Sequence, residues 1–177
     1  MRPPRAHHCS KCGQCSLRLD HHCAFMGVCV GARNYKAFCL FLLHAFILSS
    51  TMILASYAYW HWGNGEASER HWAVSCFFWT ENVALCLGEL FVGAMVFVHC
   101  LLVAVNVTSL ERKKGAALYF PGTNPTEQVP LTQHNPYDLG PDQNFVSVFG
   151  ANPFLVFWPY PDDSQLQGSR FPTCPPP

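Results

Sequence analysis

The sequence predicts a mainly α-helical membrane protein: a zinc-braced cysteine-rich domain, then two transmembrane helices, then a cytosolic C-terminal segment. Three observations predict this class. The chain of 177 residues is 50% hydrophobic but only 12% charged, about half the charged share of ordinary soluble domains. Its charges fall in blocks that are separated by two long apolar stretches. Five of its ten Cys and four of its nine His residues lie within the first 30 positions.

The first element, residues 1–36, is a block of potential metal ligands. A structural zinc ion takes four Cys or His ligands in a tetrahedral array, and two of them commonly come from a tight C-x-x-C turn. Cys9 and Cys12 form such a pair, and Cys12 and Cys15 form a second, overlapping one. The block holds more ligands than one ion needs, which indicates two sites with residues left over. The candidate ligands are His7, His8, Cys9, Cys12, Cys15, His21, His22, Cys23 and Cys29.

A carboxylate, a base and a thiol also lie within four positions of this block, at Asp20, His21 and Cys23. A Cys reacts as a nucleophile in its thiolate form, which a neighbouring His can generate by taking the proton. A carboxylate on the far ring nitrogen would fix the tautomer of the His, as in a catalytic triad. The same residue types also bind zinc, so the residues alone leave catalysis and metal binding open.

The two apolar stretches, residues 37–60 and 83–105, are predicted to be transmembrane helices. At a rise of about 1.5 Å per residue, each can cross a hydrocarbon core of about 30 Å. The first holds no charged residue and ends in Tyr57, Tyr59 and Trp60, which suit a membrane interface. The second contains Glu89, which should face protein or water and is either a functional carboxylate or a helix-packing partner.

The charges orient this pair of helices. Residues 1–36 hold six Lys and Arg against one Asp, whereas residues 61–81 hold three Glu against one Arg. The positive-inside rule therefore predicts that residues 61–81 form a lumenal loop and that both termini are cytosolic. In the reducing cytosol the Cys block should carry thiols or metal ligands.

The same charge pattern excludes some function classes. The net charge is zero, and the Cys-rich block lies next to a predicted membrane span. Both features disfavour a zinc-finger protein that binds nucleic acid, so we expect no nucleic-acid partner. The high apolar content excludes disorder for most of the chain. Twelve of the fourteen Pro residues follow position 120, so we expect a cytosolic segment over 106–158 and an irregular Pro-rich tail over 159–177.

Several short motifs carry a family resemblance. Residues 3–9 read Pro-Pro-Arg-Ala-His-His-Cys, residues 20–23 read Asp-His-His-Cys, residues 108–111 read Thr-Ser-Leu-Glu, and residues 135–140 read Asn-Pro-Tyr-Asp-Leu-Gly. Together with the Cys spacing, they closely resemble the Asp-His-His-Cys family of protein S-acyltransferases, which are integral-membrane palmitoyltransferases. The resemblance covers residues 1 to about 150 in the family's order.

This resemblance implies two zinc ions that brace the Cys-rich domain without touching the nucleophile. The second zinc would use His8 and Cys15 together with a Cys pair further upstream. That upstream pair is absent from the sequence, so we expect an incomplete second site. The implied ligands of the first zinc are Cys9, Cys12, His22 and Cys29.

The resemblance also implies a ping-pong acyl transfer. Cys23 would be the nucleophile, His21 its general base, and Asp20 the group that orients His21, while Ser109 and Asn144 match supporting positions. A fatty acyl-CoA such as palmitoyl-CoA would acylate the enzyme, which would pass the chain to a Cys of a substrate protein near the cytosolic membrane surface. The implied setting is a multi-pass protein in the lipid bilayer of the Golgi or endoplasmic reticulum.

The chain departs from the family pattern in two respects. Family members carry at least four transmembrane helices, whereas two are predicted here, matching the third and fourth. Ala24 and Phe25 also replace the Pro-Trp that usually follows the nucleophile. We therefore expect an N-terminally truncated member. The alternative to a palmitoyltransferase is a catalytically inactive, zinc-braced membrane adaptor or a fragment of such an enzyme.

Overall fold

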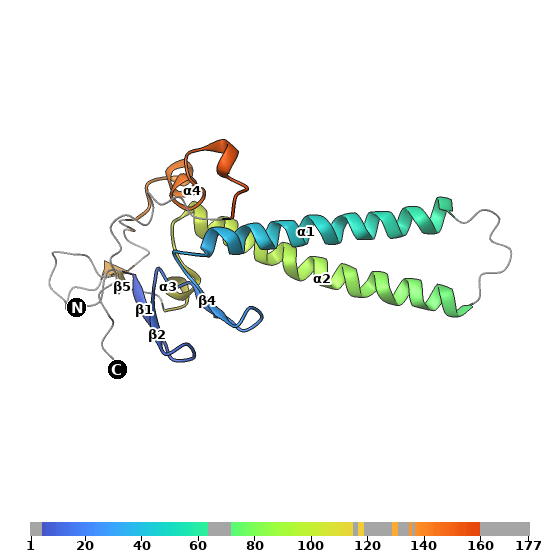
Figure 1. Ribbon diagram of the computed structural model, residues 1–177, viewed down its shortest axis with the longest axis horizontal. Coiled ribbons are helices and arrows are strands. Elements are labelled where there is room, and N and C mark those ends of the chain that lie inside the picture. Colours follow the sequence, from blue (N-terminus) through green and yellow to red (C-terminus); the bar gives the residue numbers. More distant parts are fainter. Residues whose placement is uncertain are drawn as a thin grey trace. The chain divides into compact units, whose positions relative to one another are not determined.

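Two β-hairpins precede two long helices in the fold (Figure 1). The computed structural model describes residues 5–63, 72–114, 117–118, 129–130, 135 and 137–159. The chain divides into two units, residues 1–40 with 100–177 and residues 41–99. The first unit holds the hairpins and the C-terminal elements, and the second holds most of the two helices.

The two hairpins are short antiparallel ribbons that are built in the same way. Each turn closes on a glycine with positive φ, 65° at Gly13 and 68° at Gly27, where a residue with a Cβ would be strained. The sequence predicts a mainly helical protein, and these strands were not expected from its pattern. The paired strands are β1 (Ala6–Cys9) with β2 (Gln14–Leu17), and β3 (His21–Cys23) with β4 (Val28–Val30).

Within the described part of the chain, two helices are long and apolar enough to cross a membrane, as the sequence predicts. Helix α1 (Tyr35–Ala58) continues into a short π-helical turn (Tyr59–Gly63). Helix α2 (Trp72–Ala104) follows. The apolar spans within them cover Tyr35–Trp62 and Val74–Ala104, each with a mean hydropathy of 2.2.

The start of α2 differs from the predicted boundary. The apolar pattern placed the second span at residues 83–105, yet the helix begins at Trp72. Residues 72–82 contain no Pro or Gly, so polar Glu81 and Asn82 interrupt the hydropathy without interrupting the helix. Of the predicted lumenal loop over 61–81, residues 61–63 belong to the π-helical turn and residues 72–81 to α2, while residues 64–71 lie outside the described part of the chain.

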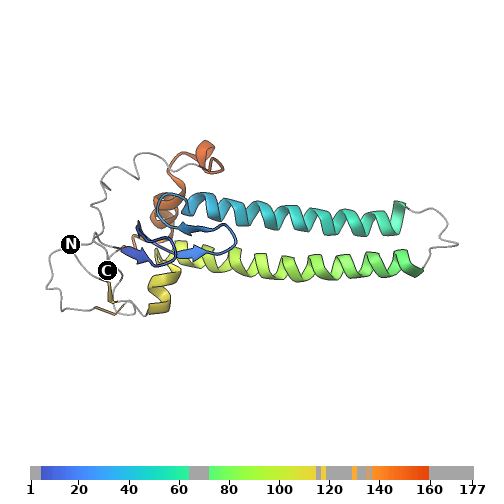
Figure 2. The ribbon, with the colours of Figure 1, turned by 60° about the horizontal axis from the view of Figure 1, so that its bottom comes forward.

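Over residues 41–99 the two helices run side by side in opposite directions (Figures 1 and 2). Polar groups join them. The carboxylate of Glu89 accepts hydrogen bonds from the hydroxyls of Ser49 and Ser50, and Asn82 Nδ2 donates to Ser56 Oγ at 3.0 Å. A carboxylate in an apolar span needs such partners, so these contacts favour a helix-packing role for Glu89.

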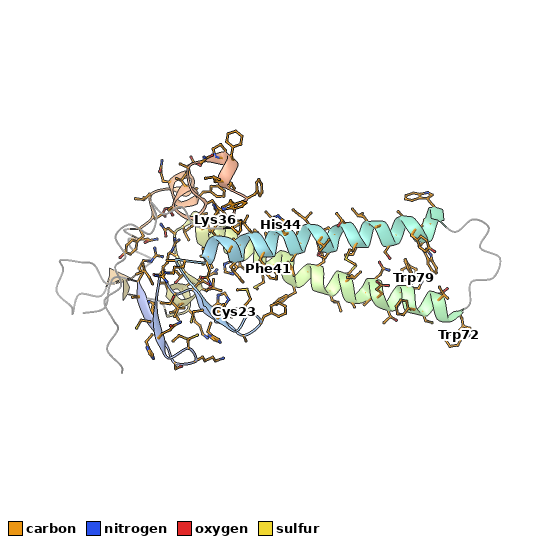
Figure 3. The ribbon with its side chains drawn as sticks, in the orientation of Figure 1. Cys23, Lys36, Phe41, His44, Trp72 and Trp79 are labelled. Carbon is orange, nitrogen blue, oxygen red and sulfur yellow. The ribbon has the colours of Figure 1, made fainter. Side chains whose placement is uncertain are left out.

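Aromatic side chains gather where α1 ends and α2 begins, as the labelled Trp72 and Trp79 illustrate (Figure 3). Trp62 and Trp72 each expose 78% of their surface. Tyr57 and Tyr59 are also more than half exposed. Exposed rings of this kind are typical of a membrane–water interface.

Short elements make up the predicted segment over 106–158. They are α3 (Ser109–Lys114), β5 (Ala117–Leu118) paired with β6 (Val129–Pro130), α4 (Pro141–Phe149) and a 3₁₀ turn (Pro153–Leu155). The predicted Pro-rich tail over 159–177 lies outside the described residues, apart from Pro159.

Candidate functional site

Strand β3 carries three predicted site residues in consecutive positions, His21, His22 and Cys23. Side chains alternate between the two faces of a strand, so His21 and Cys23 share one face and His22 lies on the other. The contacts follow this alternation, because His22 Nδ1 lies 3.2 Å from Cys12 Sγ, whereas His21 contacts Asp20 and Cys23. Three neighbouring residues therefore belong to two different sites.

Four predicted zinc ligands meet where the two hairpins face each other. The first hairpin supplies Cys9 and Cys12 from its strand end and turn. The second supplies His22 and Cys29, which are paired across β3 and β4. The ligand atoms of all four residues lie within 4.8 Å of one another.

This donor set fits a structural zinc ion. Tetrahedral zinc with sulfur and nitrogen ligands holds those atoms roughly 3.5–3.8 Å apart. Here His22 Nδ1 lies 3.2 Å from Cys12 Sγ, 3.7 Å from Cys9 Sγ and 3.9 Å from Cys29 Sγ. Three thiolates and one imidazole form a common structural zinc site.

The second predicted zinc pair is also close together. His8 and Cys15 lie opposite each other across β1 and β2, with His8 Nδ1 3.8 Å from Cys15 Sγ. They repeat the cross-strand arrangement of His22 and Cys29. Cys15 is disulfide-bonded, so the expectation that the Cys block carries only thiols or metal ligands does not hold at this position. Among the described residues, the metal-binding group that forms is the one at Cys9, Cys12, His22 and Cys29.

The predicted catalytic residues are also in contact with one another. Asp20 is almost fully buried, and its Oδ2 lies 2.7 Å from His21 Nδ1. Because Nδ1 is engaged by the carboxylate, Nε2 is the nitrogen that can face the Cys23 thiol, which hydrogen-bonds to the His21 ring. The ring of Phe38, in the first turn of α1, packs in a T-shaped arrangement against the same imidazole, with 5.1 Å between ring centroids.

These contacts favour the charged forms of the imidazole and the thiol. The hydrogen bond to Asp20 raises the pKa of His21, although burial opposes the rise. Burial raises the pKa of Cys23, but the main-chain N–H groups of Met26 and Phe25 and the His21 ring outweigh it, so the pKa is lowered. A thiolate beside an imidazolium is the form of Cys that attacks carbonyl carbon.

The turn that carries Cys23 repeats the turn that carries Cys9. In each, the glycine four residues on donates its N–H to the Cys carbonyl at 2.9 Å, Gly13 to Cys9 and Gly27 to Cys23. The sequence contains the repeat as His-His-Cys-Ser-Lys-Cys-Gly-Gln-Cys over 7–15 and His-His-Cys-Ala-Phe-Met-Gly-Val-Cys over 21–29. Met26 replaces the second Cys of the C-x-x-C pair. The repeat was not anticipated from the sequence, and Met26 leaves Cys23 without the partner thiol that Cys12 gives to Cys9.

Asp20 is held on its other side by the main chain of α3. Ser109, the first residue of α3, donates its N–H to Asp20 Oδ1 at 2.7 Å. A capping box fixes this end of the helix: the Thr108 N–H donates to Glu111 Oε2 at 2.8 Å, and the Glu111 N–H donates to Thr108 Oγ1 at 3.2 Å. The contact with Asp20 uses the main-chain N–H of Ser109, not its hydroxyl.

Arg5, near the N-terminus, pairs with Glu111 of the capping box. Its Nε donates to Glu111 Oε1 at 2.7 Å and its Nη2 donates to Glu111 Oε2 at 2.8 Å. Both side chains are buried, so each charge depends on the other. Burial raises the pKa of Glu111, but Arg5 and Thr108 outweigh it and the pKa is lowered. The guanidinium also lies 4.6 Å above the ring centroid of Tyr137.

Asn106 joins this cluster just after α2, and no sequence-based expectation identified it. Its Oδ1 accepts hydrogen bonds from Arg5 and Arg18, both at 2.9 Å, and its Nδ2 donates to Tyr137 O at 2.7 Å. Its φ is 49°, a conformation that Asn adopts more readily than most residues. An Asn directly after an apolar span was the available signal in the sequence.

Asn144, predicted as a supporting residue, is completely buried. Its Nδ2 donates to Ala104 O at 2.7 Å and to Asp138 Oδ1 at 2.6 Å. Its Oδ1 accepts from Leu139 N at 3.0 Å and from Asn106 Nδ2 at 3.4 Å. All four hydrogen-bonding capacities of the amide are used, so α4 is joined to the end of α2.

Comparison with known proteins agrees with this geometry. A model of the DHHC palmitoyltransferase family matches residues 1–116. The chain belongs to this family. It is 34% identical over 172 residues to "Probable protein S-acyltransferase 13" of Arabidopsis thaliana and 35% identical over 193 residues to "Probable protein S-acyltransferase 12" of the same plant. It is 34% identical over 179 residues to "Palmitoyltransferase ZDHHC2" of Danio rerio.

The alignments differ in how much of each protein they include. They cover 93%, 98% and 98% of this chain, but 51%, 58% and 45% of the three relatives. The chain therefore spans about half the length of the DHHC palmitoyltransferase relatives it matches.

The proposed zinc site predicts a loss of metal when one ligand is removed. Cys29→Ser should lower the zinc content of the purified protein by about one ion per chain, because hydroxyl is a poor substitute for thiolate. Elemental analysis after dialysis measures this. Cys86→Ser, at an exposed position of α2, is the matched control and should keep its zinc. Equal zinc contents in the two variants would contradict the assignment.

The Arg5–Glu111 pair predicts a specific stability loss. Arg5→Met leaves the Glu111 charge buried and unpaired, and should lower the free energy of unfolding by about 3 kcal/mol. Denaturant unfolding in detergent measures this, with Arg112→Met at an exposed position of α3 as the control. Adding Glu111→Gln to Arg5→Met should restore part of the loss. No recovery in the double variant would argue against a charge-pairing effect.

Proposed function

We propose that this chain is a protein S-palmitoyltransferase, in which Cys23 receives a fatty acyl group from acyl-CoA and passes it to a Cys of a substrate protein. The observation that carries the proposal is the line of contacts from Asp20 through His21 to Cys23. Family membership supports it, since relatives of similar sequence are named S-acyltransferases and palmitoyltransferases.

In the first step His21 takes the proton of the Cys23 thiol at Nε2. The Cys23 sulfur attacks the thioester carbonyl carbon of the acyl-CoA, the new C–S bond forms, and the bond to the CoA sulfur breaks. The leaving CoA thiolate takes a proton, which the His21 imidazolium can supply. Asp20 stabilises that imidazolium and holds the ring in one orientation.

In the second step the thiol of a substrate protein gives its proton to His21 and attacks the acyl-Cys23 thioester. The acyl group moves to the substrate sulfur, and the Cys23 sulfur leaves as a thiolate that the imidazolium reprotonates. The free enzyme is restored without any change in oxidation state. The sequence of acyl-enzyme formation and discharge is ping-pong.

Zinc would serve this reaction as a brace. Cys9, Cys12, His22 and Cys29 would hold it, and bound zinc would supply rigidity by crosslinking the two hairpins. His22 lies between the base and the nucleophile in the strand, so fixing its ring fixes the backbone of both neighbours. Cys15 is disulfide-bonded in the structure, and only as a free thiolate would it join His8 as a ligand of a second zinc site.

We also propose an orientation: the Cys-rich domain and both ends of the chain in the cytosol, α1 and α2 across an endomembrane of the Golgi or endoplasmic reticulum. The charge distribution supports this. In sealed vesicles, an epitope added after residue 177 should be accessible to antibody without detergent. An epitope inserted between residues 65 and 66 should become accessible only after detergent. The reverse pattern would contradict the orientation.

The catalytic proposal predicts acylation at one cysteine. Purified protein incubated with a labelled palmitoyl-CoA should acquire label that hydroxylamine releases, and Cys23→Ser should lower it to background while keeping its zinc. Asp20→Asn should slow the labelling by about a hundredfold, because it removes the charge that stabilises the imidazolium. Cys86→Ser should behave as the unmodified protein.

The adaptor alternative makes the opposite prediction. A zinc-braced protein without catalytic activity would bind zinc and show the same background label before and after Cys23→Ser. That result would contradict the palmitoyltransferase proposal while leaving the metal site in place.

A further inference from the structure

The last described segment, residues 151–159, is both apolar and exposed. Eight of its nine residues are exposed, and Phe154, Phe157 and Trp158 expose 91%, 66% and 58% of their surface. No charged residue lies between Asp142 and Asp162. Contiguous exposed apolar side chains of this kind mark a surface that contacts something other than water.

A buried lysine fixes this segment beside the first turn of α1 (labelled in Figure 3). Lys36 is 4% exposed, and its Nζ donates to Phe149 O at 2.8 Å and to Leu155 O at 2.7 Å. These carbonyls belong to the last residues of α4 and of the 3₁₀ turn. The last carbonyls of a helix have no hydrogen-bond donor within the helix. Charged donors make the stronger hydrogen bonds, so the backbone of the segment is held at the level of Lys36.

Lys36 marks the edge of the apolar span. It is the second residue of the stretch Tyr35–Trp62, and the sequence has no further charge until Glu66. A lysine at the end of a membrane helix keeps its amino group outside the hydrocarbon core. The Leu155 carbonyl that accepts from this amino group therefore lies at the same depth, next to the boundary of the hydrocarbon.

We propose that the segment over 153–158 is an interfacial membrane anchor. Its side chains Phe154, Leu155, Phe157 and Trp158 enter the boundary between headgroups and acyl chains, in the leaflet where α1 begins. Trp and Phe favour this depth, and the lack of charge suits it. The occupant is lipid because the patch continues directly from the start of a membrane span. This anchor is independent of the acyl chemistry and rests on α1 crossing the bilayer.

Photocrosslinking from lipid tests the anchor in the full chain. The protein is placed in nanodiscs of phosphatidylcholine that carries a diazirine near the ester end of one acyl chain. After photolysis, adducts are mapped by mass spectrometry. Adduct yield on residues 154–158 should lie within about threefold of the yield on Phe41 of α1, because both face lipid near the interface.

Two double variants sharpen the test. Phe154→Asp with Phe157→Asp should reduce adducts on Trp158 by about tenfold, because carboxylates resist entry into the apolar side of the interface. Phe154→Leu with Phe157→Leu keeps the segment apolar and should keep the adducts.

Adducts on Phe41 without adducts on residues 154–158 would overturn the anchor. The same result is expected if the segment contacts another protein and not lipid. Adducts on neither would overturn the membrane placement of α1 and the anchor with it. Palmitoylation of Cys23 is assayed separately in the same nanodiscs, so a failure of the proposed activity is distinguishable from a failure of the anchor.

Discussion

The hydrogen bond from the Ser109 main chain to the buried Asp20 carboxylate is the contact on which the site depends. It joins residues 89 positions apart in the chain, one before β3 and one at the start of α3. A buried carboxylate remains ionised only where donors satisfy it. One carboxylate oxygen accepts from the α3 main chain and the other is hydrogen-bonded to His21. The Asp20 side chain is therefore held in one orientation. The orientation of the imidazole toward Cys23 therefore depends on a helix that lies far along the chain from both residues.

The buried polar groups around this contact form one connected network. The capping box orients the Ser109 N–H, Arg5 holds Glu111 of that box, and Asn106 receives the remaining hydrogen bonds of Arg5. Asn144 extends the network to α4. Networks of this kind are stable when every member is satisfied and costly when one is lost. The start of the Cys-rich domain, the end of α2 and the C-terminal segment are therefore expected to order together.

The sequence identified the Cys-rich block as metal-binding from its C-x-x-C spacing, but left nine candidate ligands open. The family resemblance selected Cys9, Cys12, His22 and Cys29, and the structure brings these four together on two hairpins that the sequence pattern did not reveal. The start of α2 was misplaced, because hydropathy responds to Glu81 and a helix does not. Asn106 was missed, because its role depends on side chains that reach it from distant positions. A local sequence pattern does not show which distant side chains meet in the folded protein.

The repeated hairpin turn places Cys23 at the position that Cys9, a candidate metal ligand, has in the first hairpin. In both turns the main-chain amides of the next residues point at the sulfur, so the backbone is prepared for a negatively charged sulfur in either case. In the first turn, Cys12 supplies a second thiol three residues after Cys9. In the second turn, the equivalent position is Met26, which has no thiol. Under the proposed function, one turn geometry serves a zinc ligand at Cys9 and a nucleophile at Cys23. Met26 removes the chelating thiol from the second turn, and His21 with Asp20 supplies the base.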